Sequence, residues 1–102
     1  MWRQGDVLIQ AIAEIPDGVS AKSDLILAEG EATGHMHRIA DGKTAELFEK
    51  GAEMFLRVFT PNATVVHDEH GPIALKPGNY RVWLQREYAP EVLRIKTRPV
   101  RD

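Results

Sequence analysis

The chain has 102 residues, a formal net charge of −2 and 43% hydrophobic residues, which is the composition of one globular domain spanning residues 1–102. The negative charge disfavours nucleic acid as a partner, and the absence of cysteine excludes disulfides and thiolate metal sites. No apolar run is long enough to cross a bilayer. Polar residues follow Met1 and Trp2 at once, so we expect no signal peptide and a cytoplasmic location.

The N-terminal half consists of short apolar stretches separated by turn residues. Proline presets φ and glycine accepts a positive φ, so Ile15–Gly18 is a predicted turn, and Ala40–Lys43 is a hairpin signal. Gly42 argues against a helix over 40–50, the longest helix candidate. The predicted strands are Asp6–Ile12, Leu25–Ala28, Thr33–Ile39 and Ala45–Glu49.

The C-terminal half continues the same pattern after a predicted turn at Lys50 and Gly51. Its strands show the alternation of apolar and polar residues that one buried face requires. They are Met54–Phe59, Thr64–His67, Ile73–Leu75, Tyr80–Glu87 and Val92–Thr97. One short helical turn is expected at most, near Pro90 and Glu91. The whole pattern predicts an all-β fold, a single small antiparallel barrel or sandwich of about seven or eight short strands.

All four histidines fall in two short segments, His35 with His37 and His67 with His70. In a strand, residues two apart point to the same face, so His35 and His37 project side by side. Ile39 shares that face, and its burial would place the histidines in the interior or at its mouth. Neutral imidazole is a common ligand for zinc, iron, copper and nickel, and this spacing suits a shared metal ion.

The second segment ends a predicted strand and runs into a turn at Gly71 and Pro72. The turn would bring His67 and His70 together. Asp68 and Glu69 are then candidate oxygen ligands or hydrogen-bond acceptors that orient the imidazoles. The sequence thus predicts a metal site formed by His35, His37, His67 and His70 at one mouth of the barrel, with Glu31 as a further supporting residue.

Two other interpretations of the histidines stay open. They could form a hydrogen-bonded polar cluster without metal, or be four independent surface residues. The donor set is nitrogen and oxygen, which suits zinc, iron, manganese or nickel and does not choose among them.

The segment from Gly30 to His37 and the later segment from Leu75 to Tyr80 resemble parts of the two cupin motifs. The first cupin motif carries a glycine, His-x-His and a glutamate, and the second carries Pro-x-Gly. The resemblance implies a small β-barrel with His35 and His37 as metal ligands. No histidine follows Pro77 and Gly78, so a third ligand would come from the second histidine segment.

The chain also resembles a family of small bacterial proteins of uncharacterised function, over most of its length. This resemblance implies no known activity. The residues that carry it are Gln4–Val7, Gly30, Glu31, Thr33–His35, His37, Arg38, His67, Glu69, His70, Pro77, Gly78, Tyr80–Val82 and Gln85–Tyr88.

Two functions of different classes follow from these patterns. The first is a metal-binding β-barrel with a small-molecule ligand, with enzyme activity left open. The second is a non-catalytic interaction module that docks a partner or forms a homodimer through Trp83, Phe55 or Phe59. A basic stripe of Arg94, Lys96 and Arg98 gives a weaker third hypothesis, contact with nucleic-acid phosphates.

Overall fold

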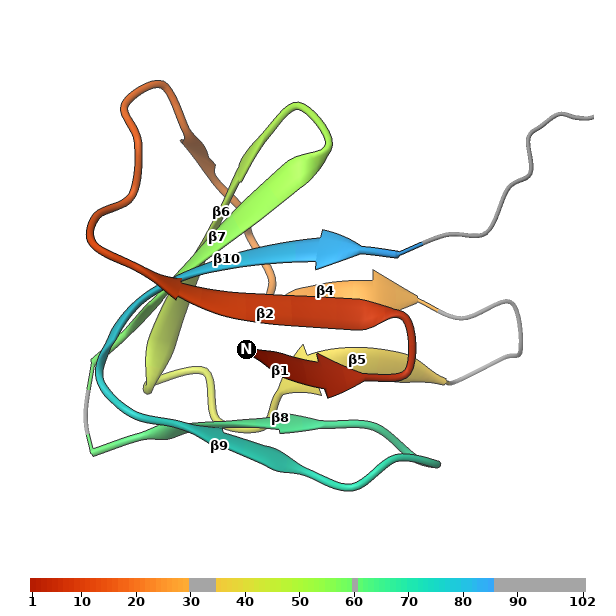
Figure 1. Ribbon diagram of the computed structural model, residues 1–102. Helices are drawn as coiled ribbons and strands as arrows, with labels where there is room; N and C mark the ends of the chain where they lie inside the picture. Colours follow the sequence, from red (N-terminus) through yellow and green to blue (C-terminus); the bar gives the residue numbers. More distant parts are fainter. Residues whose placement is uncertain (30–34, 60, 86–102) are drawn as a thin grey trace, which may run out of the picture.

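The computed structural model describes residues 1–29, 35–59 and 61–85. These residues form ten strands in two antiparallel sheets and no helix, so none of them provides a helix that could cross a membrane. The sheets face each other, with the β1–β2 turn and the β8–β9 loop at the right-hand end of Figure 1 and the β6–β7 turn at the top. The all-β prediction is confirmed.

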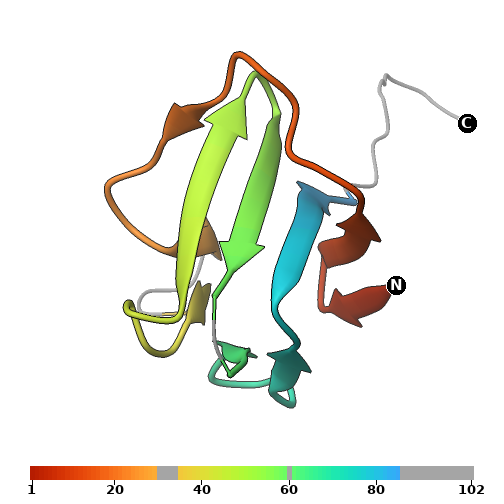
Figure 2. The same ribbon diagram turned by 90° about the vertical axis from the view of Figure 1, so that its left-hand side faces the viewer.

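The six-stranded sheet is built around two hairpins and a long central strand (Figure 2). Gly51 has a φ of 62° and allows the tight turn between β6 and β7, whose register runs from Ala45 opposite Val58 to Lys50 opposite Glu53. The strand order is β1 (Trp2–Gln4), β2 (Val7–Ile12), β10 (Gly78–Leu84), β7 (Glu53–Val58), β6 (Ala45–Lys50) and β3 (Ser20–Ala21).

The four-stranded sheet has short strands and a register shift in β4 between Ile26 and Ala28. The residues between β5 and β8 include the whole β6–β7 hairpin, so the chain leaves this sheet and returns to it. The strand order is β4 (Ile26–Glu29), β5 (Met36–Ile39), β8 (Ala63–Val66) and β9 (Ile73–Leu75).

One hydrophobic core lies between the sheets, because alternate residues of each strand point inward. Tyr80 is buried there, and its hydroxyl donates a hydrogen bond to the carbonyl of Lys76 at 2.6 Å. Burial raises the pKa of Tyr80 above its usual range, so it stays a neutral donor. Trp2 packs edge-on against Tyr80 at 5.6 Å between ring centroids. The largest fully buried side chains in the described part of the chain are Val7, Ile9, Leu47, Leu56, Val65, Leu75 and Val82.

The outer face of the six-stranded sheet carries a second group of aromatic residues, Phe48, Phe55 and Trp83. Phe55 is 4% exposed although it is not part of the core between the sheets. The guanidinium of Arg81 lies 4.3 Å from the Trp83 ring centroid, and that of Arg57 lies 5.3 Å from the Phe48 centroid. Long arginine side chains thus cover the apolar surface that the sheet leaves on this side.

Several sequence predictions need correction. The prediction of about seven or eight strands was low, because β1 and β3 are too short to show alternation. Ala40–Lys43 is not a hairpin turn, since β5 and β6, which it joins, belong to different sheets. Pairing among the described strands does not close a barrel. The predicted strand over 92–97 and the helical turn near 90–91 lie outside the described residues.

Candidate functional site

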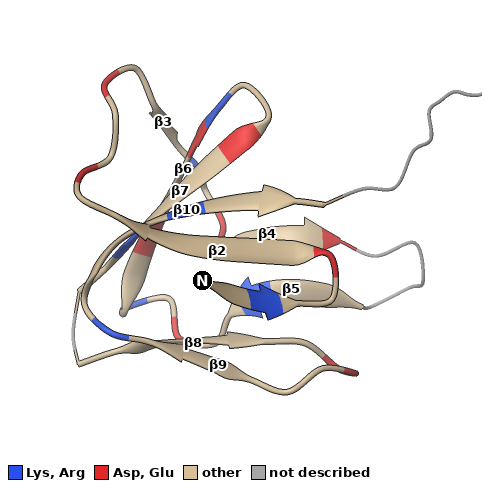
Figure 3. Cartoon of the chain, in the orientation of Figure 1, with Lys and Arg blue, Asp and Glu red and all other residues tan. Residues whose placement is uncertain are grey.

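Three segments that are distant in the sequence meet at one end of the molecule. They are the β1–β2 turn, the start of β5 and the loop between β8 and β9, all on the right in Figure 1. Figure 3 places acidic residues at the β1–β2 and β8–β9 turns. The start of β5 carries His35 and His37, and the β8–β9 loop carries His67 and His70. We call these four residues the histidine cluster.

The four imidazole rings lie next to one another. His37 stacks on His67 with ring centroids 4.1 Å apart and planes at 30°. His70 lies 4.8 Å from His67 and 5.9 Å from His37, and His35 lies edge-on to His67 at 6.0 Å. These distances agree with the prediction that the two histidine segments meet, and the four rings are not independent surface residues.

Burial differs strongly within the histidine cluster. His37 is 8% exposed and lies on the inward face of β5 next to Ile39, which is 4% exposed. His35 and His67 are half-buried, and His70 is exposed. The cluster therefore runs from the edge of the core to solvent, as expected from the burial of Ile39.

Gln4 at the end of β1 holds His37 and the β8–β9 loop together. Its side-chain oxygen Oε1 lies 2.8 Å from Nδ1 of His37. Its Nε2 donates to the carbonyls of Val65 at 3.1 Å and Gly71 at 2.8 Å. Gln4 is 2% exposed, and all of its polar atoms have partners. A buried amide with a full set of hydrogen bonds links the two sheets at this end.

Gly5 lets the backbone of the β1–β2 turn approach the rings. Gln4 pairs with Val7, so Gly5 and Asp6 form a two-residue turn, and Gly5 has a φ of 60°. A Cβ on Gly5 would lie 3.0 Å from Nε2 of His70 and 3.2 Å from Cε1 of His37. Only glycine fits this position without moving the imidazoles.

The pKa of His37 is lowered from its ordinary value of 6.5. Burial is the largest cause, because the charged imidazolium loses its hydration. The neighbouring His67 and His70 lower the pKa further, and Asp6 partly offsets the effect. His37 is therefore neutral at pH 7, and a neutral imidazole is the form that ligates a metal ion.

Of the predicted supporting carboxylates, Glu69 lies at the histidine cluster. Its Oε2 is 3.6 Å from Nδ1 of His35, and its backbone N–H donates to Nδ1 of His67 at 3.0 Å. Asp68 is exposed, and Glu31 lies outside the described residues. Asp6, which was not predicted, contributes through its effect on His37.

The present side-chain positions do not form a finished metal site. Within the described ranges, no group of three or more His, Asp or Glu side chains is placed to hold an ion. Stacking is consistent with this, because the rings of His37 and His67 lie face to face at 4.1 Å rather than edge-on around a common point. His torsions at χ2 are soft, so the exposed and half-buried rings can turn toward His37. The donor chemistry therefore fits a metal ion, whereas the ring orientation fits only after rotation.

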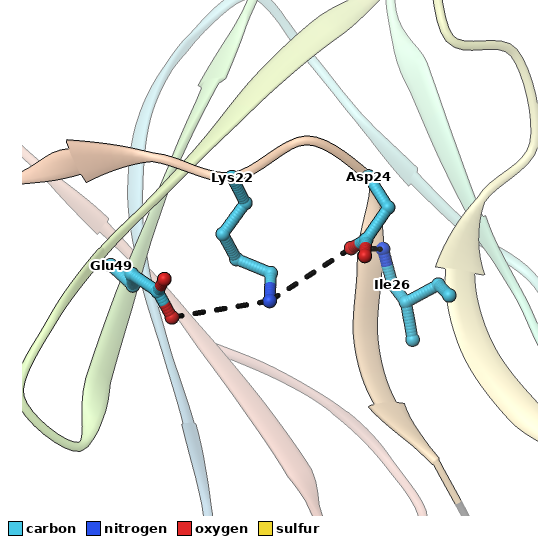
Figure 4. A network of polar contacts seen from close by, with 4 residues as sticks. All are labelled: Lys22, Asp24, Ile26 and Glu49. Atoms are coloured by element: carbon cyan, nitrogen blue, oxygen red, sulfur yellow. Dashed lines mark hydrogen bonds and ion pairs between the residues drawn. The ribbon is translucent and has the colours of Figure 1, made fainter.

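A separate cavity of about 470 Å³ lies where the chain passes from β3 to β4. Leu25, Ile39 and Leu47 are the large apolar residues among those that line it. At its rim Lys22 lies between Asp24, at 3.8 Å, and Glu49, at 4.0 Å (Figure 4). Asp24 also accepts a hydrogen bond from the backbone N–H of Ile26 at 3.1 Å. None of the histidines lines this cavity.

Three residues of the site were missed by sequence reasoning, Gln4, Gly5 and Asp6. All three belong to the Gln4–Val7 segment that carries the family resemblance, which was the only signal that marked them. The basic stripe over 94–98 lies outside the described residues.

The fold and the site define a small β protein of two antiparallel sheets with a histidine cluster at one end. A family model described as "Domain of unknown function (DUF8820)" matches residues 3–85, and the chain belongs to this family. No curated protein and no solved structure matches the chain. The resemblance to an uncharacterised family is thereby confirmed, whereas these comparisons lend no support to the cupin resemblance.

Proposed function

We propose that this protein binds a divalent transition-metal ion through the histidine cluster. The observation that supports the proposal is the gathering of the other three imidazoles around His67, with centroid distances of 4.1 Å to His37, 4.8 Å to His70 and 6.0 Å to His35. Packing alone does not account for four imidazoles in contact, because each ring brings polar nitrogens that need partners.

His37 is the central ligand in this proposal. A ligating histidine must be neutral, and the lowered pKa of His37 keeps it so without any metal present. Its Nδ1 is engaged by Gln4, which resembles the outer hydrogen bond that metal-ligating histidines usually make. Glu69 lies in the corresponding place beside His35.

The donor set narrows the choice of metal. Imidazole nitrogens suit zinc, nickel, iron and copper, whereas manganese prefers carboxylate and water oxygens. We therefore expect Zn²⁺ or Ni²⁺ to bind more tightly than Mn²⁺. A bound divalent ion supplies Lewis acidity. The exposed side of the cluster, at His70, leaves room for a small oxygen-bearing ligand.

The test is a titration of the full chain, purified without an affinity tag and stripped with EDTA. We expect one Zn²⁺ per chain by elemental analysis and isothermal titration calorimetry, and a rise in Tm with added Zn²⁺. His37→Asn should weaken Zn²⁺ binding by roughly tenfold or more. The Asn amide can still donate a hydrogen bond to Gln4, but it has no counterpart of the His37 Nε2 atom that would bind the metal.

Glu49→Gln is the matched control, since Glu49 lies at the separate rim with Lys22. It changes one charge and should leave the Zn²⁺ affinity as in the wild type. The proposal fails if the stripped protein takes up no Zn²⁺ or Ni²⁺, or if His37→Asn binds as tightly as the wild type.

A second candidate function is self-association through the outer face of the six-stranded sheet. Phe59 is 42% exposed, and Phe48 and Trp83 are partly exposed on the face that points away from the other sheet. Sedimentation velocity of the metal-free protein distinguishes the candidates. A concentration-dependent dimer that Phe59→Ser abolishes supports self-association, and a monomer at all concentrations rejects it.

A further inference from the structure

The orientation of the Gln4 amide is determined by its surroundings. One end of the amide faces two backbone carbonyls, those of Val65 at 3.1 Å and Gly71 at 2.8 Å. A carbonyl oxygen only accepts hydrogen bonds, so the atom that faces both must be the NH₂ group. The other end, Oε1, then faces Nδ1 of His37.

This orientation fixes where neutral His37 carries its proton. Oε1 of Gln4 can only accept, so Nδ1 of His37 must donate across the 2.8 Å contact. A neutral imidazole has one N–H, and Nε2 is therefore left with a free lone pair. Gln4 thus holds His37 in the Nδ1–H tautomer, which is the less populated form of a free histidine side chain.

His67 has the opposite requirement. The backbone N–H of Glu69 donates to its Nδ1 at 3.0 Å, so Nδ1 is an acceptor and neutral His67 carries its proton on Nε2. The two stacked rings, 4.1 Å apart, therefore differ in tautomer although they are the same residue type. As they stand, His37 offers a lone pair at Nε2 and His67 offers an N–H there.

We propose that Gln4 is a positioning residue that sets the tautomer of His37 and makes His37, rather than His67, the anchoring ligand of the histidine cluster. The second half of this inference rests on the proposed metal-binding function, and the first half does not. Gln4 touches no ligand in this arrangement and acts only through His37.

The tautomers can be measured directly in the metal-free protein. Long-range ¹H–¹⁵N correlation spectra of the full chain at about pH 8, where histidine is neutral, report which ring nitrogen carries hydrogen. We expect Nδ1–H for His37 and Nε2–H for His67. In Gln4→Met, which has similar volume but no hydrogen bonds, His37 should shift toward Nε2–H while His67 stays unchanged as an internal control.

Gln4→Glu separates the positioning role from a purely structural one. A carboxylate keeps an acceptor toward His37 and loses both donated hydrogen bonds, so Nδ1 of His37 should stay protonated while Tm falls. Gln4→Met should lower Zn²⁺ affinity about 10–100-fold, the usual effect of removing the group that orients a ligating histidine. Gln4→Glu should retain most of the affinity.

Each outcome decides part of the proposal. An Nε2–H tautomer for His37 in the wild type overturns it, as does a Gln4→Met protein that is folded and keeps Nδ1–H. Should Gln4→Met fail to fold, Gln4→Glu decides: retained Nδ1–H supports the proposal, and its loss overturns it. A wild type with the expected tautomers but no Zn²⁺ uptake rejects the metal-binding function and leaves the positioning role of Gln4 standing.

Discussion

The histidine cluster and the outer face of the six-stranded sheet both place polar groups beside aromatic rings, but the hydrogen-bond partners of these groups differ in their access to solvent. At the outer face, Arg81 pairs with Glu53, and the two side chains are 34% and 43% exposed. At the histidine cluster, Gln4 is 2% exposed and its partners are backbone carbonyls and one imidazole. Water can replace a lost partner in the first region and not in the second.

This difference indicates where the molecule tolerates change. An exposed ion pair contributes little, because solvent screens the charges and hydrates them when the pair breaks. A buried amide or imidazole that loses its partner keeps the full cost of desolvation, about 1–3 kcal/mol. Substitutions are therefore expected to lower the free energy of unfolding only slightly at the outer face and strongly around Gln4 and His37.

The largest expected effect comes from Gly5→Ala at the β1–β2 turn. The positive φ alone costs an alanine about 1–2 kcal/mol, and the new Cβ would also lie 3.0 Å from Nε2 of His70 and 3.2 Å from Cε1 of His37. We expect a loss of about 2–4 kcal/mol in the free energy of unfolding, measured with urea, together with weaker Zn²⁺ binding.

Gly51→Ala is the matched control for this substitution. Gly51 has nearly the same φ, 62°, but a Cβ there meets nothing within 4 Å. It should cost only the backbone term, about 1–2 kcal/mol, and leave Zn²⁺ binding as in the wild type. Equal losses in the two variants would mean that the approach of the turn to the imidazoles is unimportant.

The next effect concerns pH. The pKa of His37 is lowered in the folded protein relative to 6.5, so the unfolded chain takes up this proton first as the pH falls. The contribution of neutral His37 to stability is present above pH 6.5 and is lost as the pH drops from 6.5 through the lower folded pKa. Urea unfolding of the metal-free protein across this range should show decreasing stability.

His37→Asn provides the control for the pH effect, since Asn can donate to Gln4 but does not titrate. Its stability should depend less on pH below 6.5 than that of the wild type. NMR titration of the wild type should also give His37 a pKa lower than 6.5. A wild-type pKa above that value contradicts the assignment of burial as the dominant cause.

Much of the fold could be predicted from local pattern. The apolar pattern identified β9 to the residue and β7 to within one residue at each end, because each has one buried face. It placed β10 correctly, although the predicted strand began at Tyr80 rather than Gly78 and extended beyond Leu84. The pattern could not show that the chain changes sheets after β5, since Ala40–Lys43 contains the residues of a hairpin turn. Sheet membership depends on long-range packing, which a short sequence window does not contain.

The candidate site was predicted only in part, for a similar reason. The spacing of His35 and His37 in one strand indicates a shared face, and the structure brings His67 and His70 to it. Nothing local marks Gln4 as buried, because glutamine is usually exposed and its partners lie 33 and 61 residues away in the chain. Gly5 could be assigned to a turn, but its contact with the imidazoles could not be foreseen.

The smallest expected effect is at the outer face and completes the comparison. Arg81 Nε donates to Glu53 Oε2 at 2.8 Å, and its guanidinium stacks on Trp83. A double-mutant cycle of Arg81→Met and Glu53→Gln should give a coupling energy below about 1 kcal/mol, because both side chains of the half-buried pair still reach solvent. Methionine still covers Trp83, so the apolar contact is largely retained. Neither substitution should change Zn²⁺ affinity or the tautomer of His37, and a coupling of several kcal/mol here would remove the distinction between the two regions.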